Sequence, residues 1–600
     1  MPPSQTEASA EQRSARAVLL AFRRLAGGWW GGETAGTAWR LSLGLAGLLV
    51  LNIGISLCVN QWNRAFFDAL EQRSGRTLGL LVVALVAVVV LVAVVGVFIV
   101  IVRETLQVRW RQWLVGRLTD SWLARQRFYR LPLAGLEPAN PEYRIADDSR
   151  MATEPVVDFV IGLVHALLTA LAFVGILWSV GGGIDVPLGG MSIHVPAYLM
   201  LAALAYGAAA SWLTLRVGRP LIGAVAQRNE AEARLRFELT RLRENAESIA
   251  MIGGEGPERG RIGHTYTTLV ERWLAVVALH GRLTWITNAS GTLVPVIPLL
   301  LAAPKYLSGE LSLGAVTQLA AAFTQVQVAI AWLVDNYKQV AQWHASAERV
   351  LALGQAVEEL EQPTTISAIA RREAPDGTIG LTGVVIADRT GRLLVRDLDL
   401  VIAPGDRVLI MGESGAGKST VLRALVGLWP WGEGTAAMPA GLRLGYAPQH
   451  PYLPLGTLRD ALAYPGRDAP PPDERMAEAL VQCNLPELRH RLDQVERWDR
   501  ILSQGEIQRL GFARLLLQRP DCIIMDEATS GLDELSQAQL MAVLLRECPE
   551  ATIISIGHRP SLRPFHTRCF LLRKGNEGSI IEEEPQPGPV RAALQAVRTA

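Results

Sequence analysis

The phosphate-loop pattern G-x-x-x-x-G-K-S/T is matched by Gly412-Glu413-Ser414-Gly415-Ala416-Gly417-Lys418-Ser419-Thr420. Residues 407–411, before the loop, form a short apolar run that is typical of a buried parallel strand. Residues 421–426, after it, carry apolar side chains at helical spacing. Strand, loop and helix follow in the order that such a loop requires, which disfavours the alternative of a chance glycine-rich turn.

This loop predicts a site for a nucleoside triphosphate and Mg²⁺. Its glycines let backbone N–H groups close around phosphate oxygens, and the N-terminus of the following helix adds partial positive charge. We expect Lys418 to reach the β- and γ-phosphates and Ser419 to offer its hydroxyl to Mg²⁺. The process that the nucleotide drives has to be read from the rest of the chain.

Size and composition place the loop in a larger, partly apolar protein. The chain has 600 residues, which suggests two to four domains. Hydrophobic residues make up 50% of it, and the mean hydropathy of +0.22 is high for a soluble protein. The net charge of +1 gives no electrostatic reason to expect a nucleic-acid partner.

The cysteines and the N-terminus bear on the compartment. The five cysteines have no metal-type spacing, and four of them lie in the half that contains the phosphate loop. A reduced, cytosolic environment is the simpler interpretation for that half. Residues 1–12 are polar and lack a signal-peptide pattern, so we expect no cleaved targeting signal.

Six charge-free runs precede residue 340. A membrane-spanning helix needs about 20 apolar residues. The runs, each of about that length or longer, are 41–63, 77–102, 159–184, 186–215, 283–304 and 311–334. The fifth is interrupted by Pro295 and Pro298, which a span tolerates where neighbouring helices satisfy the freed carbonyls. We therefore predict six spans.

Arginine counts orient these spans. Nine arginines lie in 103–150, between the second and third runs, and ten lie in 216–272, between the fourth and fifth. The connections on the opposite side carry far fewer basic residues. The positive-inside rule then places both arginine-rich connections and everything after residue 340 in the cytoplasm. Heptad-like spacing in 106–131 and 230–250 predicts that the spans continue there as helices.

These patterns predict five segments. Residues 15–30 place arginines and apolar residues on alternate faces, which suits an interfacial elbow helix with Trp29 and Trp30 at headgroup depth. An ordinary amphipathic helix is the alternative. We expect an N-terminal tail and elbow helix, a transmembrane domain, a polar linker, a nucleotide-binding domain and a C-terminal tail at 1–36, 37–354, 355–378, 379–585 and 586–600.

A second carboxylate-bearing motif follows the phosphate loop. Residues 522–525 are apolar and predict a buried strand that ends in Asp526 and Glu527. Asp526 there can hold the Mg²⁺ shell, and Glu527 can act as the base on an attacking water. Asp-Glu after an apolar run is a weak signal alone, and its place about a hundred residues after a phosphate loop strengthens it.

Leu502-Ser503-Gln504-Gly505-Glu506-Ile507-Gln508-Arg509 resembles the signature motif of ATP-binding cassette (ABC) proteins. Further matches follow the family's order. Gln449 resembles the Q-loop glutamine that contacts Mg²⁺, residues 530–533 resemble the D-loop with Asp533, and His558 resembles the switch histidine. An isolated histidine is more often structural, but the accompanying motifs argue against that interpretation here.

The family resemblance implies a dimer. Cassettes of this kind pair head to tail, so that each nucleotide lies between the phosphate loop of one chain and the Ser503, Gln504 and Gly505 segment of the other. This chain holds a single cassette and six predicted spans. The expected fold is a multidomain membrane protein: an all-α, six-helix, exporter-type transmembrane domain and an α/β phosphate-loop domain. The expected assembly is a homodimer of half-transporters.

One departure concerns the nucleotide base. Many cassettes stack an aromatic side chain on adenine, but no aromatic residue occurs between Leu381 and Leu400. Arg389, in the corresponding turn, can stack through its guanidinium plane. The family resemblance implies ATP as the ligand, and these residues leave GTP open.

The membrane half resembles a narrower group, the bacterial SbmA/BacA-related ABC transporters, which are related to the peroxisomal acyl-CoA transporters. The matching segments are 60–70, 140–148, 232–238, 243–249, 303–310 and 449–456. Members of this group are associated with uptake of vitamin B12 or antimicrobial peptides. The resemblance implies a location in a bacterial inner membrane. At 142–143 the chain has Glu-Tyr where the group often has Asp-Gln, a difference with no physical interpretation.

Three functional hypotheses follow. The first is an ATP-driven transporter of hydrophilic or amphipathic solutes, such as peptides or cobalamin-like compounds, with uptake as the expected direction. The second keeps the fold and makes the cargo a lipid or acyl-CoA, and the third is a cassette ATPase without transport. In the sixth span, Thr317, Gln318, Thr324 and Gln325 share one helix face, which either lines a cavity or bonds a neighbouring helix.

Overall fold

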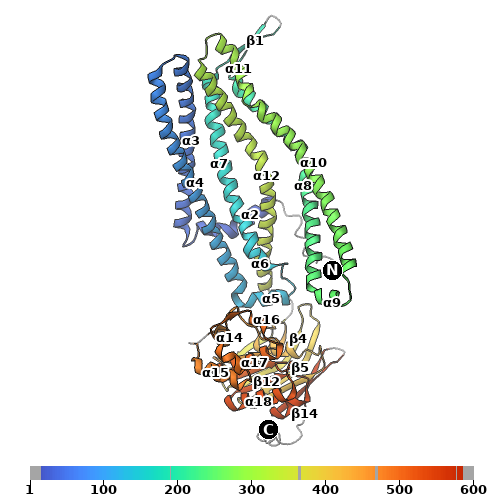
Figure 1. Cartoon of the computed structure of the whole chain (residues 1–600). Coiled ribbons are helices and arrows are strands. Elements are labelled where there is room, and N and C mark those ends of the chain that lie inside the picture. The colour runs from blue at the N-terminus through green and yellow to red at the C-terminus, as the bar shows by residue number, and fades with distance from the viewer. Residues whose placement is uncertain (1–14, 189–190, 363–366, 467–469, 576–577, 585–600) are drawn as a thin grey trace. The chain divides into compact units, whose positions relative to one another are not determined.

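The computed structural model of the chain describes residues 15–188, 191–362, 367–466, 470–575 and 578–584 (Figure 1). The chain divides into two compact units, the first ending at Glu361 and the second beginning at Gln362. The predicted C-terminal tail, 586–600, and residues 1–14 of the predicted N-terminal segment lie outside the described residues.

The first unit is built almost entirely of helices. Its elements are α2 (Ala15–Ala26), η1 (Gly27–Trp30), α3 (Ala35–Glu71), α4 (Gly75–Leu123), η2 (Ala124–Gln126), α5 (Arg127–Leu133), α6 (Pro141–Tyr143), the π-helical turn η3 (Arg144–Asp148), α7 (Ser149–Gly181), β1 (Ile184–Leu188), β2 (Met191–Val195), α8 (Tyr198–Glu244), α9 (Ala246–Met251), α10 (Glu255–Leu293), α11 (Val296–Leu307) and α12 (Leu313–Glu361). The helix α4 alone has 49 residues, roughly 70 Å at the rise of an α-helix.

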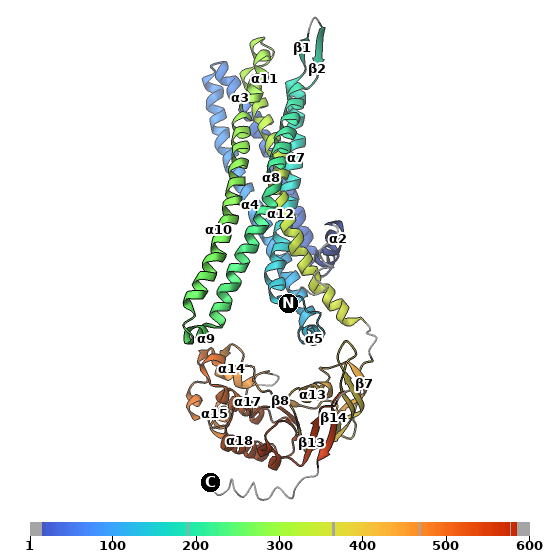
Figure 2. The same ribbon diagram turned by 90° about the vertical axis from the view of Figure 1, so that its right-hand side faces the viewer.

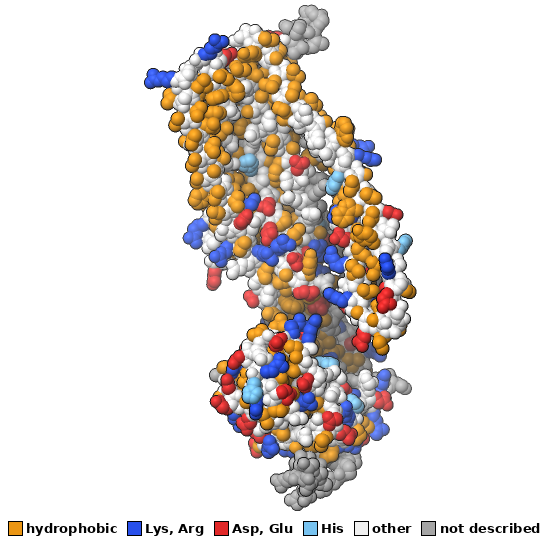
Figure 3. All heavy atoms as spheres, in the orientation of Figure 1, with side chains coloured by type: hydrophobic (Ala, Val, Ile, Leu, Met, Phe, Trp, Pro, Cys, Tyr) orange, Lys and Arg blue, Asp and Glu red, His pale blue; other side chains and the backbone are white. Residues whose placement is uncertain are grey.

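Six of these helical segments are long and apolar enough to cross a membrane, which confirms the prediction of six spans. They are Ala35–Glu71, Gly75–Leu133, Pro141–Gly181, Tyr198–Glu244, Glu255–Leu307 and Leu313–Asn336. Figure 3 shows hydrophobic side chains covering the upper part of α3 and α4, while charged side chains gather lower on this unit. On α4 the exposed large side chains from Leu80 to Ile101 are all hydrophobic, and no charged residue occurs between Arg76 and Arg103.

The predicted fourth span was wrong at its start. Residues expected to be helical from 186 onward instead form an antiparallel hairpin, in which Ile184 pairs with Val195 and Leu188 with Met191. The helix α8 begins only at Tyr198. Pro187 and Pro196 explain the difference, because proline disfavours continuation of a helix from the preceding residue. The hairpin lies at the opposite end of the unit from α5 and α9 (Figures 1 and 2).

Two further boundaries differ from the sequence prediction. The helix predicted over 106–131 is broken after Leu123, where Arg125 and Gln126 adopt left-handed backbone angles with φ of 51° and 58°. The predicted linker, 355–378, contains regular structure, because α12 extends to Glu361 and β3 (Ala370–Glu373) pairs with β7 (Gly432–Met438).

The elbow helix packs into the protein. Val18, Phe22 and Trp29 are buried, and the indole N–H of Trp110 on α4 donates to the carbonyl of Ala26 at 3.0 Å. Trp29 is only 2% exposed. It therefore packs against the helices of the unit, and the predicted position at headgroup depth is not supported for this residue.

Polar groups join α3 to α12. Asn60 donates through Nδ2 to the carbonyl of Gln318 at 3.2 Å, and Gln318 donates through Nε2 to Oε1 of Gln61 at 3.1 Å. The N–H of Gly314 donates to Oδ1 of Asp68 at 2.9 Å. Gln318 is buried, so for this residue helix–helix bonding, rather than cavity lining, is correct.

The second unit is an α/β domain. Its elements are β3, β4 (Ile379–Ala387), β5 (Leu393–Ile402), β6 (Arg407–Gly412), α13 (Lys418–Val426), β7, β8 (Leu444–Ala447), β9 (Gly456–Thr457), α14 (Leu458–Ala463), α15 (Asp473–Gln482), η4 (Pro486–His490), β10 (Val495–Glu496), α16 (Trp498–Ile501), α17 (Gln504–Gln518), β11 (Cys522–Asp526), α18 (Glu534–Glu547), β12 (Thr552–Ile556), η5 (Pro560–Phe565), β13 (Arg568–Arg573) and β14 (Ile580–Glu584). A six-stranded sheet has the order β14-β13-β6-β12-β11-β8, and a four-stranded sheet the order β3-β7-β4-β5.

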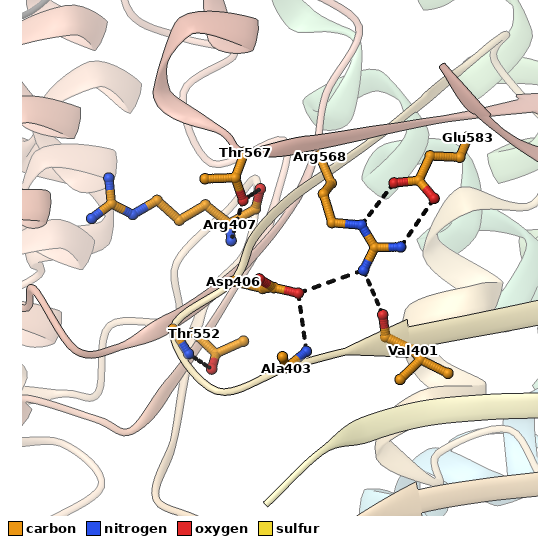
Figure 4. Close-up of polar contacts among 9 residues, drawn as sticks. Val401, Ala403, Asp406, Arg407, Thr552, Thr567, Arg568 and Glu583 are labelled. Atoms are coloured by element: carbon orange, nitrogen blue, oxygen red, sulfur yellow. Dashed lines mark hydrogen bonds and ion pairs between the residues drawn. The ribbon is translucent and has the colours of Figure 1, made fainter. Parts of the chain in front are cut away.

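Arg568 links the two sheets (Figure 4). Its guanidinium donates through Nε and Nη2 to the carboxylate of Glu583 on β14, at 2.7 and 3.0 Å. Its Nη1 donates to the carbonyl of Val401 on β5 at 2.6 Å and lies 3.5 Å from Oδ2 of Asp406. The bidentate bond lowers the pKa of the Glu583 carboxyl. Sequence-distant strands are thus joined at the edge where β6 begins.

His566 makes the stability of the second unit depend on pH. The ring is wholly buried, with Nδ1 2.8 Å from the carbonyl of Leu562 and Nε2 2.7 Å from Oγ of Ser555. Burial lowers the pKa of His566 to about 4, below the value of roughly 6.5 for an unfolded chain. The neutral ring therefore stabilises the fold above pH ~6.5, and this contribution, about 3 kcal/mol, is lost as pH falls toward 4.

We predict that the melting temperature of this unit in the full chain falls more steeply between pH 6.5 and 4 in the wild type than in His566→Gln. The substitution removes the titrating group and keeps hydrogen-bonding capacity. Differential scanning fluorimetry at a series of pH values measures the two slopes. Equal slopes would contradict the assignment of this acid sensitivity to His566.

Candidate functional site

The candidate site lies at one edge of the six-stranded sheet. The strands β8, β11, β12 and β6 are neighbours in this order and run parallel, so their carboxyl ends meet. The residues that follow these ends are Gln449, Asp526 with Glu527, His558 and the phosphate loop. Ligands of open parallel sheets bind at this edge. The topology therefore brings four sequence-predicted motifs together.

The phosphate loop connects β6 to α13, and Gly412 and Gly417 in it adopt positive φ angles. Gly412 has φ of 153°, and a Cβ added there would lie 2.5 Å from the carbonyl oxygen of Leu572 on the neighbouring strand β13. Gly417 caps α13 with φ of 97°, a conformation that favours glycine. The ammonium of Lys418 is buried and donates to the carbonyls of Gly412 and Glu413 at 2.8 and 2.9 Å. The loop is thereby closed around its own lysine.

Two of the predicted metal ligands are in contact. Oγ of Ser419 donates to Oδ1 of Asp526 at 3.1 Å. Burial raises the pKa of the Asp526 carboxyl, while the bond from Ser419 opposes that shift. A hydroxyl and a carboxylate are oxygen ligands of the kind that Mg²⁺ prefers, so the pair fits this cation. Gln449, the third predicted ligand, follows β8, and its carbonyl accepts a hydrogen bond from Gln508 at 2.9 Å.

Of the three predicted catalytic residues, Glu527, His558 and Gln449, the first two face each other. Nδ1 of His558 lies 3.9 Å from Oε1 of Glu527. The backbone of Glu527 is left-handed with φ of 50°, and its N–H donates to the carbonyl of Ile556 at 3.0 Å. A non-glycine residue held in this conformation stores strain that is characteristic of functional sites. This arrangement turns the Glu527 carboxylate to the edge where the phosphate loop lies.

The signature segment caps the helix α17. Ser503 is the N-cap, and its Oγ accepts from the N–H of Glu506 while the carboxylate of Glu506 accepts from the N–H of Ser503 at 2.7 Å. Oγ of Ser503 also donates to the Glu506 carboxylate at 2.6 Å, and this bond, followed by the one from the N–H of Ser503, lowers the pKa of the Glu506 carboxyl. The sequence analysis assigned no role to Glu506, although Ser503-x-x-Glu506 is a capping-box pattern that the sequence displays. Gln504 lies 3.2 Å from His450, measured from Nε2 to Nδ1.

The other predicted residues and the turn expected beside the base make local hydrogen bonds. Asp533 is the N-cap of α18, accepting from the N–H of Ser536 at 2.8 Å. Within the described part of the chain, no hydrogen bond joins the phosphate loop to residues 503–505. In the turn that follows β4, Asp388 accepts from the N–H of Thr390 and of Arg392 at 2.8 and 3.0 Å. This turn is the one expected beside the base.

Comparison with known families covers both units. Residues 32–307 match the family described as ABC transporter transmembrane region 2, and residues 395–530 match the family described as ABC transporter. The first match lies in the helical unit and the second contains the phosphate loop, the signature segment and Asp526–Glu527. The helical unit and the α/β unit therefore each match a family of ABC transporter domains.

Individual relatives align over most of the chain. An uncharacterized ABC transporter ATP-binding protein of Synechocystis is 33% identical and covers 78% of this chain and 70% of its own length. The inner membrane ABC transporter ATP-binding protein YddA of Escherichia coli is 27% identical, with 85% and 90% covered. The mouse lysosomal cobalamin transporter ABCD4 is 25% identical, with 79% and 82% covered.

A solved structure shows the fold. The structure of a bacterial Atm1-family ABC exporter with ATP bound superposes with a TM-score of 0.67 at 20% sequence identity, covering 93% of this chain and 96% of the other. At this identity the similarity speaks for the fold alone. The expected six-helix exporter-type architecture joined to an α/β nucleotide-binding domain is confirmed.

We predict that Gly412→Ala weakens MgATP binding about tenfold. The added Cβ would meet the carbonyl of Leu572 at 2.5 Å, so the loop that holds Lys418 must shift. Equilibrium binding to the full chain in detergent measures the change. Gly263→Ala is the control, because that helical position has open space. An unchanged affinity in Gly412→Ala would show that the close approach to β13 does not set the loop.

Proposed function

The chain belongs to the ABC transporter family, and on this premise we propose that two copies form an ATP-driven transporter of hydrophilic or amphipathic solutes. The chain is a half-transporter, with one membrane unit and one ATP-binding domain. The six candidate spans argue against the third hypothesis, a cassette ATPase without transport. The nucleotide and metal in this proposal are ATP and Mg²⁺.

The observation that carries the proposal is an incomplete site within one chain. The phosphate loop, Ser419 and Asp526 come together, while residues 503–505 instead contact the loop of His450 and the turn at Gly531. A cassette needs both halves around one nucleotide. In a head-to-tail homodimer, residues 503–505 of each copy lie against the phosphate loop of the other copy. Both nucleotide sites are then complete.

The cytoplasmic part of α8 and α10 supports the same dimer. Below the predicted spans these two helices lie side by side and present exposed apolar side chains, of which Phe237 is 69%, Leu274 61% and Val277 52% exposed (Figure 2). Such a surface is costly in water and marks an interaction site. We propose that the second copy of the chain packs against this apolar surface in the dimer.

The residues take the following roles in this proposal. The phosphate loop and Lys418 bind the β- and γ-phosphates, and Ser419, Asp526 and Gln449 surround Mg²⁺. Glu527 would accept the proton of an attacking water, and His558, whose Nδ1 lies 3.9 Å from Oε1 of Glu527, would act beside it as the switch histidine. Ser503, Gln504, Gly505 and Asp533 act across the dimer interface. Mg²⁺, when bound, neutralises charge that develops on the phosphates.

Transport follows from closing and opening the dimer. Binding of ATP brings the two cassettes together, and the long helices below the spans carry this movement to the membrane. We propose that residues 140–148 and 228–245 are the segments that couple the cassette to the membrane domain. Hydrolysis by Glu527 then separates the cassettes and restores the first state.

The nature of the cargo rests on similarity and on polarity. One relative is named a lysosomal cobalamin transporter, and segments such as 60–70 and 140–148 resemble the SbmA/BacA-related group, which supports a cargo of this kind. Within the spans, His165 lies 3.2 Å from Asn52, and Gln325 on α12 is exposed. Polar groups at this depth favour a hydrophilic path. Peptides and cobalamin-like compounds, moved by uptake, are therefore the proposed cargo.

A lipid or acyl-CoA is the second candidate. An apolar groove of about 410 Å³ lies between α8 and α10, lined by Tyr206, Leu213, Trp285, Ile286 and Leu293, among others. A groove of this kind accommodates acyl chains as readily as it accommodates a partner helix.

The proposed location is a bacterial inner membrane, with the nucleotide-binding domain in the cytoplasm. The Escherichia coli relative is named an inner membrane protein, and the positive-inside rule sets the orientation. We propose a transmembrane domain at 37–354 and a nucleotide-binding domain at 379–585, with the boundary between the compact units at Glu361 and Gln362.

We predict that hydrophilic peptides or cobalamin raise the ATPase rate of the homodimer in nanodiscs several-fold, and that acyl-CoA leaves it unchanged. Only the true cargo class stabilises the state in which the cassettes close. The rate of phosphate release, measured over a range of each compound, distinguishes the two classes. Stimulation by acyl-CoA alone would favour the second candidate.

Glu527→Gln is the control for these rates. It keeps the size and position of the side chain and removes its basicity, so we expect MgATP binding within about twofold of wild type and hydrolysis reduced by about a hundredfold or more. Hydrolysis at the wild-type rate would remove Glu527 as the base. Uptake of the stimulating compound into vesicles, with ATP on one known side, then gives the direction.

A further inference from the structure

Gln508 is a buried polar side chain that the proposed mechanism leaves without a role. It is 1% exposed and lies in the first half of α17, the helix that Ser503 caps. A buried amide is tolerated where its donors and acceptor are paired. The partners of Gln508 come from two other loops of the nucleotide site.

Three hydrogen bonds hold these loops to α17. Nε2 of Gln508 donates to the carbonyl of Gln449 at 2.9 Å and to Oγ of Ser530 at 3.3 Å. Oε1 accepts from the N–H of Gly531 at 3.0 Å. One side chain thus joins the signature helix, the loop after β8 and the turn after β11.

The packing leaves little room between these parts. A Cβ added to Gly531 would lie 3.1 Å from Oε1 of Gln508, and one added to Gly505 would lie 3.4 Å from the carbonyl oxygen of Gly531. The turn therefore rests directly on the first turns of α17. A displacement of α17 has to move residues 530–531 with it, because close-packed groups transmit rigid shifts.

Arg559 holds the same turn from the opposite side. Its Nη1 donates to the carbonyl of Leu532 at 2.6 Å, and its Nη2 donates to the carbonyl of Ser530 at 2.8 Å. Arg559 directly follows His558. The turn at 529–532 is therefore fixed both to the signature helix and to the segment that carries His558.

We propose that Gln508 is a positioning residue for ATP hydrolysis, which ties Gln449 and the turn at 530–531 to the helix that faces the partner's nucleotide. This rests on the proposed function, since it requires the head-to-tail dimer. A shift of the first turn of α17 would move Gln449, one of the residues that would hold Mg²⁺, together with the turn at 530–531. Through the turn and Arg559, the same shift reaches His558.

If Gln508 positions the catalytic groups, its loss should change the rate of ATP turnover more than the affinity for MgATP. Among the described hydrogen bonds none joins the phosphate loop or α13 to Gln508, so we expect the larger part of the affinity for MgATP to be independent of Gln508. Turnover and cooperativity between the two sites depend on it, because the displacement at one site has to reach the catalytic groups of the other. A purely structural role would instead change the folded fraction and leave turnover of the folded protein intact.

Gln508→Glu tests this in the full-length homodimer in nanodiscs. The variant keeps the shape and the acceptor for Gly531 but loses both donors. We expect the Kd for MgATP to stay within about twofold, kcat to fall about tenfold and the Hill coefficient for ATP to fall toward one. Gln518→Glu is the matched control in the same helix, because its amide donates to the carbonyl of Tyr464, away from these loops. It should leave all three quantities unchanged.

Different results would contradict the role of Gln508 and the proposed function. Wild-type kcat and Hill coefficient in a folded Gln508→Glu variant would overturn the inference. If that variant does not fold, Ser530→Ala decides, since it removes one acceptor only. The inference predicts a roughly threefold lower kcat at unchanged Kd, and a wild-type kcat would overturn it. A wild-type protein without ATPase activity would instead overturn the proposed function, whereas an active Glu527→Gln variant would only remove Glu527 as the base.

Discussion

The parallel register of β6, β12, β11 and β8 is the constraint on which the nucleotide site depends. Four segments that are far apart in the chain follow these strands, and the register places their first residues at one edge. The bond between Ser419 and Asp526 spans 107 residues of sequence and exists only because β6 and β11 flank β12. The left-handed backbone of Glu527 and the close approach of Gly412 to β13 are held by this same sheet.

The membrane unit depends on a different constraint, the pairing of polar groups between largely apolar helices. Apolar side chains face outward over much of the spans, while some polar groups make contacts between helices, as at Asn60 and Gln318. In hydrocarbon, an unpaired polar group is expensive, so each such contact fixes the relation of two helices. Below the spans the same helices carry both arginines and exposed apolar side chains. A half-transporter that pairs with a second copy accounts for that mixture.

The sequence predicted much of this because its strongest signals are local. The strands around the phosphate loop and the number of spans depend on short apolar patterns, and both were correct. The start of α8 was not, since the hydrophobicity of 186–197 outweighed Pro187 and Pro196 in the prediction. The bonds of Gln508 and Arg559 could not be predicted, because they join loops that only the folded sheet brings together. For Glu506, a local capping pattern was available.

The central claim is that each nucleotide lies between two copies of the chain. A mixed dimer tests it most directly, in which one copy carries Lys418→Ala and the other Gly505→Glu, both with Glu527→Gln to halt hydrolysis. In a head-to-tail dimer one site receives both defects and the other receives neither. We predict that the mixed dimer, purified through two tags, retains a single occluded nucleotide while each parent variant retains none. Absence of occluded nucleotide from the mixed dimer would contradict the account.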